Sequence, residues 1–318
     1  MKNNYKVITF KQKSNYKINT QICLHNVITF LWNNKVITSV LCGMGCLLFS
    51  TSSQALSFFN IPEQGNLLYG QTDPKTHLYW QEMEIPVSPD GSFVFAIPQN
   101  AEKTGILIIK KGTKKQELSF NIQPRQWIEE VVNGLEPAKV HLSPENQKRT
   151  QKEMQLVQKS RQKAALHGVI LNQKEQPLPT CFSRPTDSTA RISSQFGSRR
   201  ILNGVKKQGH SGVDYALPIG SPVYAAQNGV VLLAHPDLFY TGQTILIDHG
   251  YGLISSYSHL NQLNVQTGDF VRRGQKIGEI GMTGRATGPH LHFVLIWKGI
   301  RVDPERVLKQ RLCSDTEE

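Results

Sequence analysis

The sequence is short of three features: acidic residues near its N-terminus, long apolar runs and clustered cysteines. Residues 1–55 hold six lysines but no arginine and no acidic residue, and no apolar run reaches the roughly 20 residues of a membrane-spanning helix. Only two of the five cysteines, Cys181 and Cys313, follow position 46, which excludes a metal site built mainly from thiolates there. No nucleic-acid-binding motif is present, so no nucleic-acid partner is expected.

The positive charge is unevenly distributed along the chain. Residues 1–55 contribute +6 of the net charge of +12, and the other +6 suits an anionic partner such as a cell wall or a lipid surface. The 318 residues, of which 39% are hydrophobic, are enough for two domains with sizeable cores. The composition therefore favours globular domains over a bundle of membrane helices.

The N-terminal segment has the pattern of a secretory signal. An apolar run of signal-peptide length extends from Val36 to Phe49 behind several lysines, and Ser53-Gln54-Ala55 provides small residues for cleavage after Ala55. Residues 1–55 are thus predicted to be a signal peptide or, if uncleaved, an anchor that would be the only membrane contact. Cys181 and Cys313 remain, an even number compatible with an oxidising compartment. We expect a periplasmic or secreted protein of the cell envelope.

Residues 57–123 are predicted to form a small β-sandwich. Ser88-Pro89-Asp90-Gly91 is a turn sequence, because proline presets φ and glycine accepts positive φ. A strand is expected over 93–97, and a hairpin is expected from 105–110 and 117–122. No cluster of chemically active residues occurs here, and His77 is expected to be structural or exposed.

Residues 124–180 are predicted to be a linker that contains a helix over 144–166. Ser143 is suited to the N-cap, Pro144 to the first helical position, and Gly168 to the stop. Most helical positions are Gln, Lys, Arg or Glu, which favours a mostly solvated helix. The alternative is a spacer or lid that lies against a catalytic groove.

Residues 181–313 have the pattern of an antiparallel β domain. Short apolar runs alternate with glycine-containing turns, and strands are expected over 222–226, 230–234, 244–247, 253–259, 275–280 and 293–297. The predicted fold class is therefore mostly β: an antiparallel β domain preceded by a small β-sandwich and a connecting helix.

Five residues of this domain form a candidate metal and catalytic set. His290 and His292 lie two residues apart beside a strand, so both project to one face. His210 and Asp214 lie before the predicted strands, and His259 lies at a strand end. Two imidazoles and a carboxylate would fill three of the four positions of a Zn²⁺ ion and leave one for water. Two histidines would then remain for proton transfer and charge stabilisation.

These motifs resemble those of the lysostaphin/LytM family of zinc endopeptidases, which cleave peptide cross-links in bacterial peptidoglycan. The resemblance rests on His210-x-x-x-Asp214, Tyr257-Ser258-His259 and Gly288-Pro289-His290-Leu291-His292-Phe293, and it spans about 192–304. Residues 57–318 resemble secreted members that carry a β-sandwich before a LytM-type peptidase domain. The resemblance implies one zinc ion held by His210, Asp214 and His292, with His259 and His290 as catalytic residues and peptidoglycan peptide stems as substrate.

The resemblance also implies a mechanism and leaves alternatives open. His290 would take a proton from water and pass it to the leaving amine, and His259 would bind the oxyanion, although the two could share these roles. Tyr240, Thr241 and residues 282–287 are expected to line the groove, whereas His235 and His249 are expected to be surface or structural residues. A non-catalytic wall-binding regulator or activator of other hydrolases on the same fold, and an unrelated secreted zinc peptidase, are the alternatives. The bond between D-Ala and a diamino acid is preferred over a pentaglycine bridge as the target, because no glycine-bridge-binding module is visible.

The two remaining cysteines flank this domain. Cys181 lies just before its first strand and Cys313 just after its last element, and domain termini are often close in space. We therefore predict a Cys181–Cys313 disulfide, the alternative being two unpaired thiols in which Cys313 belongs to a polar tail.

Overall fold

The computed structural model describes residues 30–32, 35–37, 56–132, 143–170, 178–202, 205–206 and 209–310. Strands β1 (Phe30–Trp32) and β2 (Lys35–Ile37) pair antiparallel with each other within a unit, residues 9–54, distinct from Ala55–Glu318. The predicted signal segment and its cleavage position lie almost wholly outside the described residues. Across those described ranges, no helix has the length and apolar character needed to cross a membrane.

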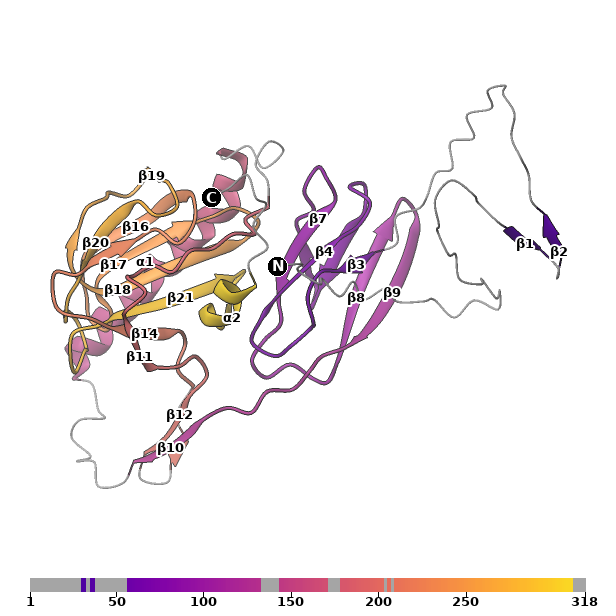
Figure 1. Cartoon of the computed structure of the whole chain (residues 1–318). Helices are drawn as coiled ribbons and strands as arrows, with labels where there is room; N and C mark the ends of the chain where they lie inside the picture. Colours follow the sequence, from indigo (N-terminus) through magenta and orange to yellow (C-terminus); the bar gives the residue numbers. More distant parts are fainter. Residues whose placement is uncertain are drawn as a thin grey trace. The chain divides into compact units, whose positions relative to one another are not determined.

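Residues 57–121 form two small antiparallel sheets that share one aromatic core (Figure 1). Phe58 and Phe120 approach with ring centroids 5.2 Å apart, and Trp80 contacts both Phe95 and Phe120. The first sheet has the order β3 (Ser57–Phe58), β4 (Leu67–Gln71), β7 (Ser92–Ala96). The second has the order β6 (Met83–Ile85), β5 (His77–Trp80), β8 (Thr104–Lys111), β9 (Lys114–Asn121). The predicted hairpin is β8–β9, and its turn contains Gly112 at a φ of +58°.

A ten-stranded antiparallel sheet dominates the C-terminal part (Figure 1). Its main path is β11 (Arg191–Ser194), β14 (Val213–Ala216), β21 (Leu291–Trp297), β18 (Leu253–Leu263), β17 (Gly242–Asp248), β16 (Gly229–Leu238), β19 (Phe270–Val271). Beside this path, β20 (Lys276–Ile280) pairs with β18 and β15 (Pro222–Tyr224), and β22 (Ile300–Val302) pairs with β21. The mostly antiparallel β fold predicted from the sequence is confirmed.

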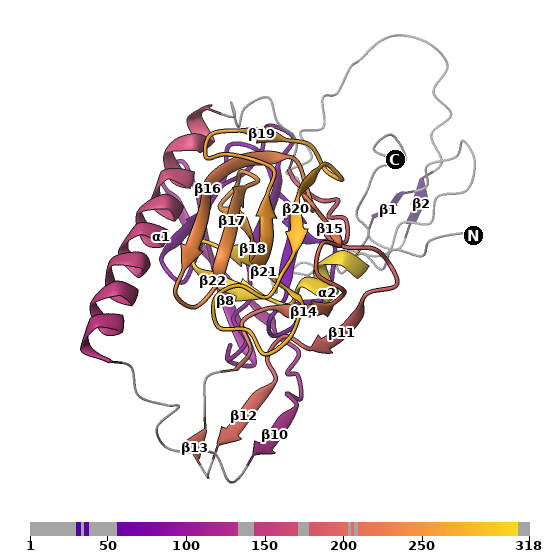
Figure 2. The ribbon, with the colours of Figure 1, turned by 90° about the vertical axis from the view of Figure 1, so that its left-hand side faces the viewer.

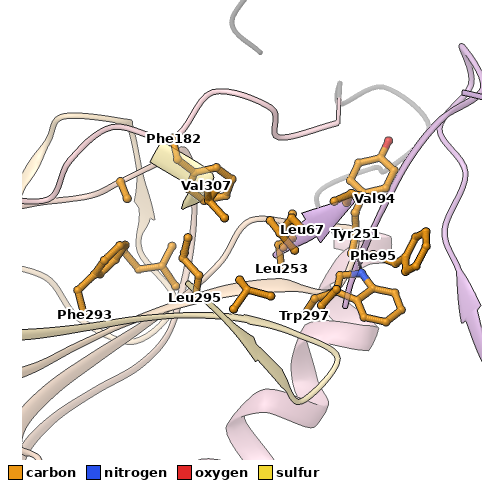
Figure 3. Packing of buried hydrophobic residues seen from close by; sticks show 14 of the residues in the cluster. Leu67, Val94, Phe95, Phe182, Tyr251, Leu253, Phe293, Leu295, Trp297 and Val307 are labelled. Carbon is orange, nitrogen blue, oxygen red and sulfur yellow. Dashed lines mark hydrogen bonds between the residues drawn. The ribbon is translucent and has the colours of Figure 1, made fainter. Parts of the chain in front are cut away.

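The two faces of strand β21 contact different parts of the protein. Its odd-numbered side chains, such as Phe293 and Trp297, are fully buried in the main core, since alternate residues of a strand point to opposite faces. Trp297 also contacts Phe95 of the first sheets, with ring centroids 6.3 Å apart (Figure 3). Its even-numbered side chains are His292, Val294 and Ile296, which lie on the other face.

The small sheets are joined to the large sheet by polar contacts as well. Arg125 Nη2 lies 2.8 Å from Asp303 Oδ2, and both side chains are largely buried. The Asp303 amide donates to the Gly65 carbonyl. These contacts and the Phe95–Trp297 packing give the residues from 57 onward a shared interior.

Helix α1 (Pro144–Ile170) packs along the large sheet (Figure 2). Ser143 caps it, because its Oγ accepts from the Asn146 amide at 3.2 Å. Most described side chains of α1 are exposed, as the polar sequence predicts, but Val157 packs against a buried apolar cluster of the sheet. That cluster consists of Leu232, Leu233, Leu246, Ile254, Val294 and Ile296. Because Val294 and Ile296 share a strand face with His292, α1 covers the same face of the sheet that carries His292.

Several elements were not predicted from the sequence, including a short C-terminal helix and a strand in the connector. Helix α2 (Pro304–Lys309) begins after Asp303, whose side chain accepts from the Glu305 amide. Strand β10 (Glu129–Val132), within the predicted linker, pairs parallel with β12 (Arg199–Leu202), which also pairs with β13 (Val205–Lys206).

The predicted disulfide can be followed at one end. Cys181 is buried and disulfide-bonded, whereas Cys313 lies outside the described residues. The pairing of Cys181 with Cys313 therefore stays a prediction.

Candidate metal centre and active site

Three of the predicted site residues meet at the start of two neighbouring strands. Asp214 in β14 lies directly opposite His292 in β21, so their side chains share one face of the sheet. His210 lies in the segment just before β14, where the Gly197 amide donates to its carbonyl. The antiparallel pairing therefore brings His292 next to two residues, Asp214 and His210, that precede it in the sequence by 78 and 82 positions.

The three side chains place one donor atom each around a common point. His292 Nδ1 lies 2.7 Å from Asp214 Oδ1 and 3.1 Å from His210 Nε2, and His210 Nε2 lies 3.2 Å from Asp214 Oδ1. All three residues are only partly exposed. Such a group of nitrogen and oxygen atoms within 4.8 Å of one another is a candidate metal-binding set.

Hydrogen bonds at the far side of each ring orient the imidazoles. Nδ1 of His210 lies 3.1 Å from the Gln195 carbonyl, which can only accept, so this nitrogen carries the proton and Nε2 keeps its lone pair. Nε2 of His292 lies 3.3 Å from Ser211 Oγ, which leaves Nδ1 facing His210 and Asp214. Electron pairs that converge in this way repel one another unless a cation lies among them, and a set of two imidazoles and a carboxylate suits Zn²⁺.

His259 and His290 lie beside this donor set. Their ring centroids are 4.7 Å apart, and Nε2 of His290 lies 3.9 Å from Asp214 Oδ1. Nδ1 of His259 donates to the Thr283 carbonyl and Nδ1 of His290 donates to the Gly288 carbonyl, each at 2.8 Å. Both rings therefore keep a free Nε2 lone pair. The structure thus brings all five predicted residues together.

Comparison with known proteins identifies the family of this region. Residues 208–304 match the model of peptidase family M23. The chain is 44% identical over 142 residues to peptidoglycan DD-endopeptidase ShyA of Vibrio cholerae, which covers 43% of this chain and 32% of ShyA. It is 41% identical over 119 residues to the DD-carboxypeptidase/endopeptidase Mpg of Neisseria meningitidis, covering 37% of this chain and 27% of Mpg. Residues 208–304 form a peptidase family M23 domain.

A solved structure extends the likeness beyond the M23 domain. A putative peptidase M23 from Pseudomonas aeruginosa has a TM-score of 0.57 and 28% identity, and the match covers 78% of this chain and 96% of that chain. The fold that precedes the M23 domain here is thus also part of the likeness. The chain spans only about a third of the length of the curated relatives that it matches.

The electrostatics of the M23 domain follow from burial and from the close pairing of its polar groups. Burial alone would raise the pKa of Asp214, but the close approach of His210 and His292, which favour the carboxylate when their rings are protonated, outweighs it and holds that pKa well below its usual range. Burial lowers the pKa of His292, and it lowers the pKa of His259 to about 4. The carboxylate is therefore ionised and His259 is neutral near neutral pH.

Strained and irregular backbone places His259. It has a φ of +64°, a left-handed conformation that is uncommon for a residue other than glycine. The pairing of β18 shifts register on both sides of this residue, and the His259 amide donates to the Thr241 carbonyl. The irregularity turns the imidazole towards His290, which agrees with the tendency of backbone strain to occur at functional sites.

The segments predicted to line the groove are adjacent to His259. Thr241 and Thr283 both provide backbone carbonyls that bind it, and the Arg285 amide donates to the Tyr240 carbonyl. Tyr240 and Met282 are among the exposed large apolar side chains. That Tyr240, Thr241 and residues 282–287 line a groove stays a prediction, and their contacts with His259 and with one another agree with it.

The orienting role of several residues was not predicted from the sequence, although Thr283 lies in the predicted groove segment and Gly288 in the quoted motif. They act through a backbone carbonyl or a hydroxyl: Ser194, Gln195, Ser211, Thr283 and Gly288. Three other histidines that the structure describes have contacts of their own. His249 is buried and bonded to the Asn228 carbonyl and Ser255 Oγ, His235 contacts the Asp237 amide, and His77 pairs with Glu84 on the surface.

Proposed function

We propose that the protein is a zinc-dependent endopeptidase that hydrolyses peptide cross-links of bacterial peptidoglycan in the cell envelope. The observation that carries this proposal is the convergence of His210, Asp214 and His292 on one point with His259 and His290 beside them. The DD-endopeptidase names of the relatives support the D-Ala to diamino-acid bond as the target.

Zinc would be held by Nε2 of His210, a carboxylate oxygen of Asp214 and Nδ1 of His292. Zinc bound at such sites lowers the pKa of water and polarises a carbonyl oxygen. The hydrogen bonds of Gln195 and Ser211 fix the two imidazoles, and their effect on orientation is typical of residues that support metal ligands.

The two other histidines would move protons. We assign to Nε2 of His290 the acceptance of a proton from the attacking water, because this atom is near Asp214 and carries no proton when Nδ1 binds the Gly288 carbonyl. The same proton then passes to the leaving amine. Nε2 of His259 is likewise unprotonated in the neutral ring, so it can donate to an oxyanion only after it has accepted a proton.

Digestion of purified peptidoglycan tests the proposal. The zinc-loaded protein should convert cross-linked muropeptides to monomers, and mass spectrometry of the products should identify the bond that is cleaved. A chelator should abolish the reaction and added zinc should restore it. Asp214→Asn removes the ligand charge with little change in shape and is the matched inactive variant. If the wild-type protein binds peptidoglycan but releases no product with zinc present, a non-catalytic wall-binding role replaces the enzyme.

A further inference from the structure

A cavity between α1 and the large sheet has a composition that the proposed reaction does not explain. It measures about 980 Å³, and its lining includes Met154 and Val157 of α1, Tyr240 and Thr241, and Ile254 of β18. This is the upper end of the usual range of ligand pockets, about 300–1,000 Å³. The floor is apolar because it belongs to the cluster that packs under α1.

Three basic side chains line the cavity: Arg161 of α1, Arg301 of β22, and Lys298, which lies between β21 and β22. Arg301 lies opposite Ile296 in the β21–β22 pair, so it is on the sheet face that carries His292. Nε of Arg161 is buried and has no hydrogen-bond partner among the residues that the structure describes. Neither guanidinium has an ion pair with any residue that the structure describes.

The acidic side chain that lines the cavity does not compensate these charges. Glu153 accepts from Arg149 Nε with one carboxylate oxygen and from the Phe239 amide with the other. Lys298 is partly satisfied, because its Nζ donates to the Glu84 carbonyl. Burial, followed by the positive charge of Arg301, lowers the pKa of Arg161, as expected where two cations lie close together. A buried polar group without a partner is rare in proteins and indicates a missing partner.

Two residues of the cavity lining are also hydrogen-bonded to the catalytic region. Thr241, which lines it, accepts from the His259 amide at 2.8 Å. Tyr240, which also lines it, is bonded through its carbonyl to the Arg285 amide in the predicted groove loop. A substrate that reaches from the catalytic histidines across the sheet face would therefore enter the cavity under α1.

We propose that this cavity is a substrate subsite that binds a carboxylate-bearing segment of the peptidoglycan stem peptide, with Arg161 and Arg301 as the binding residues. The inference rests on the proposed function. Stem peptides carry free carboxylates, and guanidinium groups bind carboxylates with paired hydrogen bonds. The apolar floor and Tyr240 would contact the alanine side chains and the aliphatic part of the peptide. Helix α1 is then a wall of the substrate site.

The test compares two substrates and three variants. One substrate is a cross-linked muropeptide dimer with free stem carboxylates, and the other is the same dimer with these carboxylates amidated. Arg161→Met and Arg301→Met remove the two charges, and Lys159→Met removes an equal charge from an exposed position of α1 outside the cavity lining. Zinc content and melting temperature are measured for each variant, and Arg301 is exposed enough that its replacement leaves the core intact.

The arginine variants are expected to lose the preference of the wild-type protein for the free-acid dimer over the amidated dimer. Wild type and Lys159→Met should cleave the free-acid dimer with a kcat/KM about tenfold above that for the amidated dimer, the usual scale of one charge-assisted hydrogen bond. Each arginine variant should lose this difference, mainly through a higher KM for the free-acid dimer. Equal kinetics of the arginine variants and wild type on both dimers would overturn the subsite and leave the proposed function standing.

A binding measurement separates the subsite from the proposed reaction. If wild type cleaves neither dimer, the proposed function fails, and calorimetry with the uncleaved free-acid tetrapeptide then decides the subsite. Binding to wild type and Lys159→Met that is about tenfold weaker in Arg301→Met supports it. Equal binding by all three proteins, or no binding by any, overturns it.

Discussion

Asp248 and His249 are predicted to give the unfolding free energy two opposite dependences on pH. Asp248 is fully buried, its Oδ1 accepts from the Gly250 amide, and its Oδ2 has no partner among the described residues. Burial raises the pKa of Asp248 from 3.8 to about 6. Burial likewise lowers the pKa of its neighbour His249 from 6.5 to about 4.

The signs follow from which state binds more protons. Between pH 4 and 6 the folded state holds a proton on Asp248 that the unfolded state has lost, so this residue makes stability fall as pH rises. Over nearly the same range the unfolded state holds a proton on His249 that the folded state lacks, so this residue makes stability rise with pH. Each pKa difference corresponds to ~3 kcal/mol, and the two contributions nearly cancel in the wild-type protein.

Asp248→Asn should expose the contribution of His249. The unfolding free energy of the variant minus that of wild type should rise by ~3 kcal/mol as the pH is raised from 4 to 7. A constant loss of about 1–3 kcal/mol, from burying an unpaired amide, is superimposed at every pH and does not affect that difference. His249→Gln should show the reverse, with stability that falls as pH rises from 4 to 6.

Urea unfolding at closely spaced pH values from 4 to 8 measures these effects, and the m-value checks that the unfolding transition stays comparable between variants. Asp269→Asn is a suitable control, because it makes the same substitution at an exposed position of the same domain. A difference between Asp248→Asn and wild type that is the same at pH 4 and pH 7 would refute the reasoning, since burial would then not raise the pKa of Asp248.

Three further predictions concern the metal centre and the cysteines. Alanine in place of His210, Asp214 or His292 should abolish zinc binding and hydrolysis; normal zinc stoichiometry in all three variants, by atomic absorption, would remove the ligand assignment. Alanine at His259 or His290 should keep the zinc but lower kcat by about 10²–10⁴-fold, and a metal-free variant would require a new ligand set. Peptide mapping without reductant should link Cys181 to Cys313, a bridge that could stabilise the fold by up to about 4–5 kcal/mol; both thiols reacting freely with an alkylating agent would contradict it.

Some of the strands, and the pairing of His290 with His292 on one face, were predictable because they depend on local pattern. Apolar runs bounded by glycine gave parts of β17, β18 and β21, because the predicted ranges 244–247, 253–259 and 293–297 lie within the observed strands but end short of their limits. The shared face of His290 and His292 follows from their two-residue spacing. The turn at Gly112 was likewise predictable, because glycine readily adopts the positive φ that this residue has. The resemblance of the motifs, rather than periodicity, joined His210 and His259 to the same set.

The remaining features depend on long-range contacts that leave little trace in the sequence. The carbonyls that orient His210, His259 and His290 could belong to any residue type, since every residue has one. Helix α2 did have a readable signal in Asp303-Pro304, but six residues are too few for a visible apolar period. The contact of α1 with the sheet was obscured because, among the helix side chains that the structure describes, only the apolar Val157 packs on the buried cluster.

One face of strand β21 carries both a candidate metal ligand and the apolar side chains that lie under helix α1. His292, Val294 and Ile296 follow one another at two-residue intervals, so the metal-binding position and the apolar floor under α1 belong to one surface. Opposite them in β18, Ser258, Ser256 and Ile254 continue this surface from the site to the helix. Removing α1 would expose the buried side chains of Val294 and Ile296, at a cost of roughly 1.5–3 kcal/mol for each. The helix therefore has a physical reason to stay on the sheet face that carries His292, and in the proposed substrate site it would form a wall beside the M23 domain.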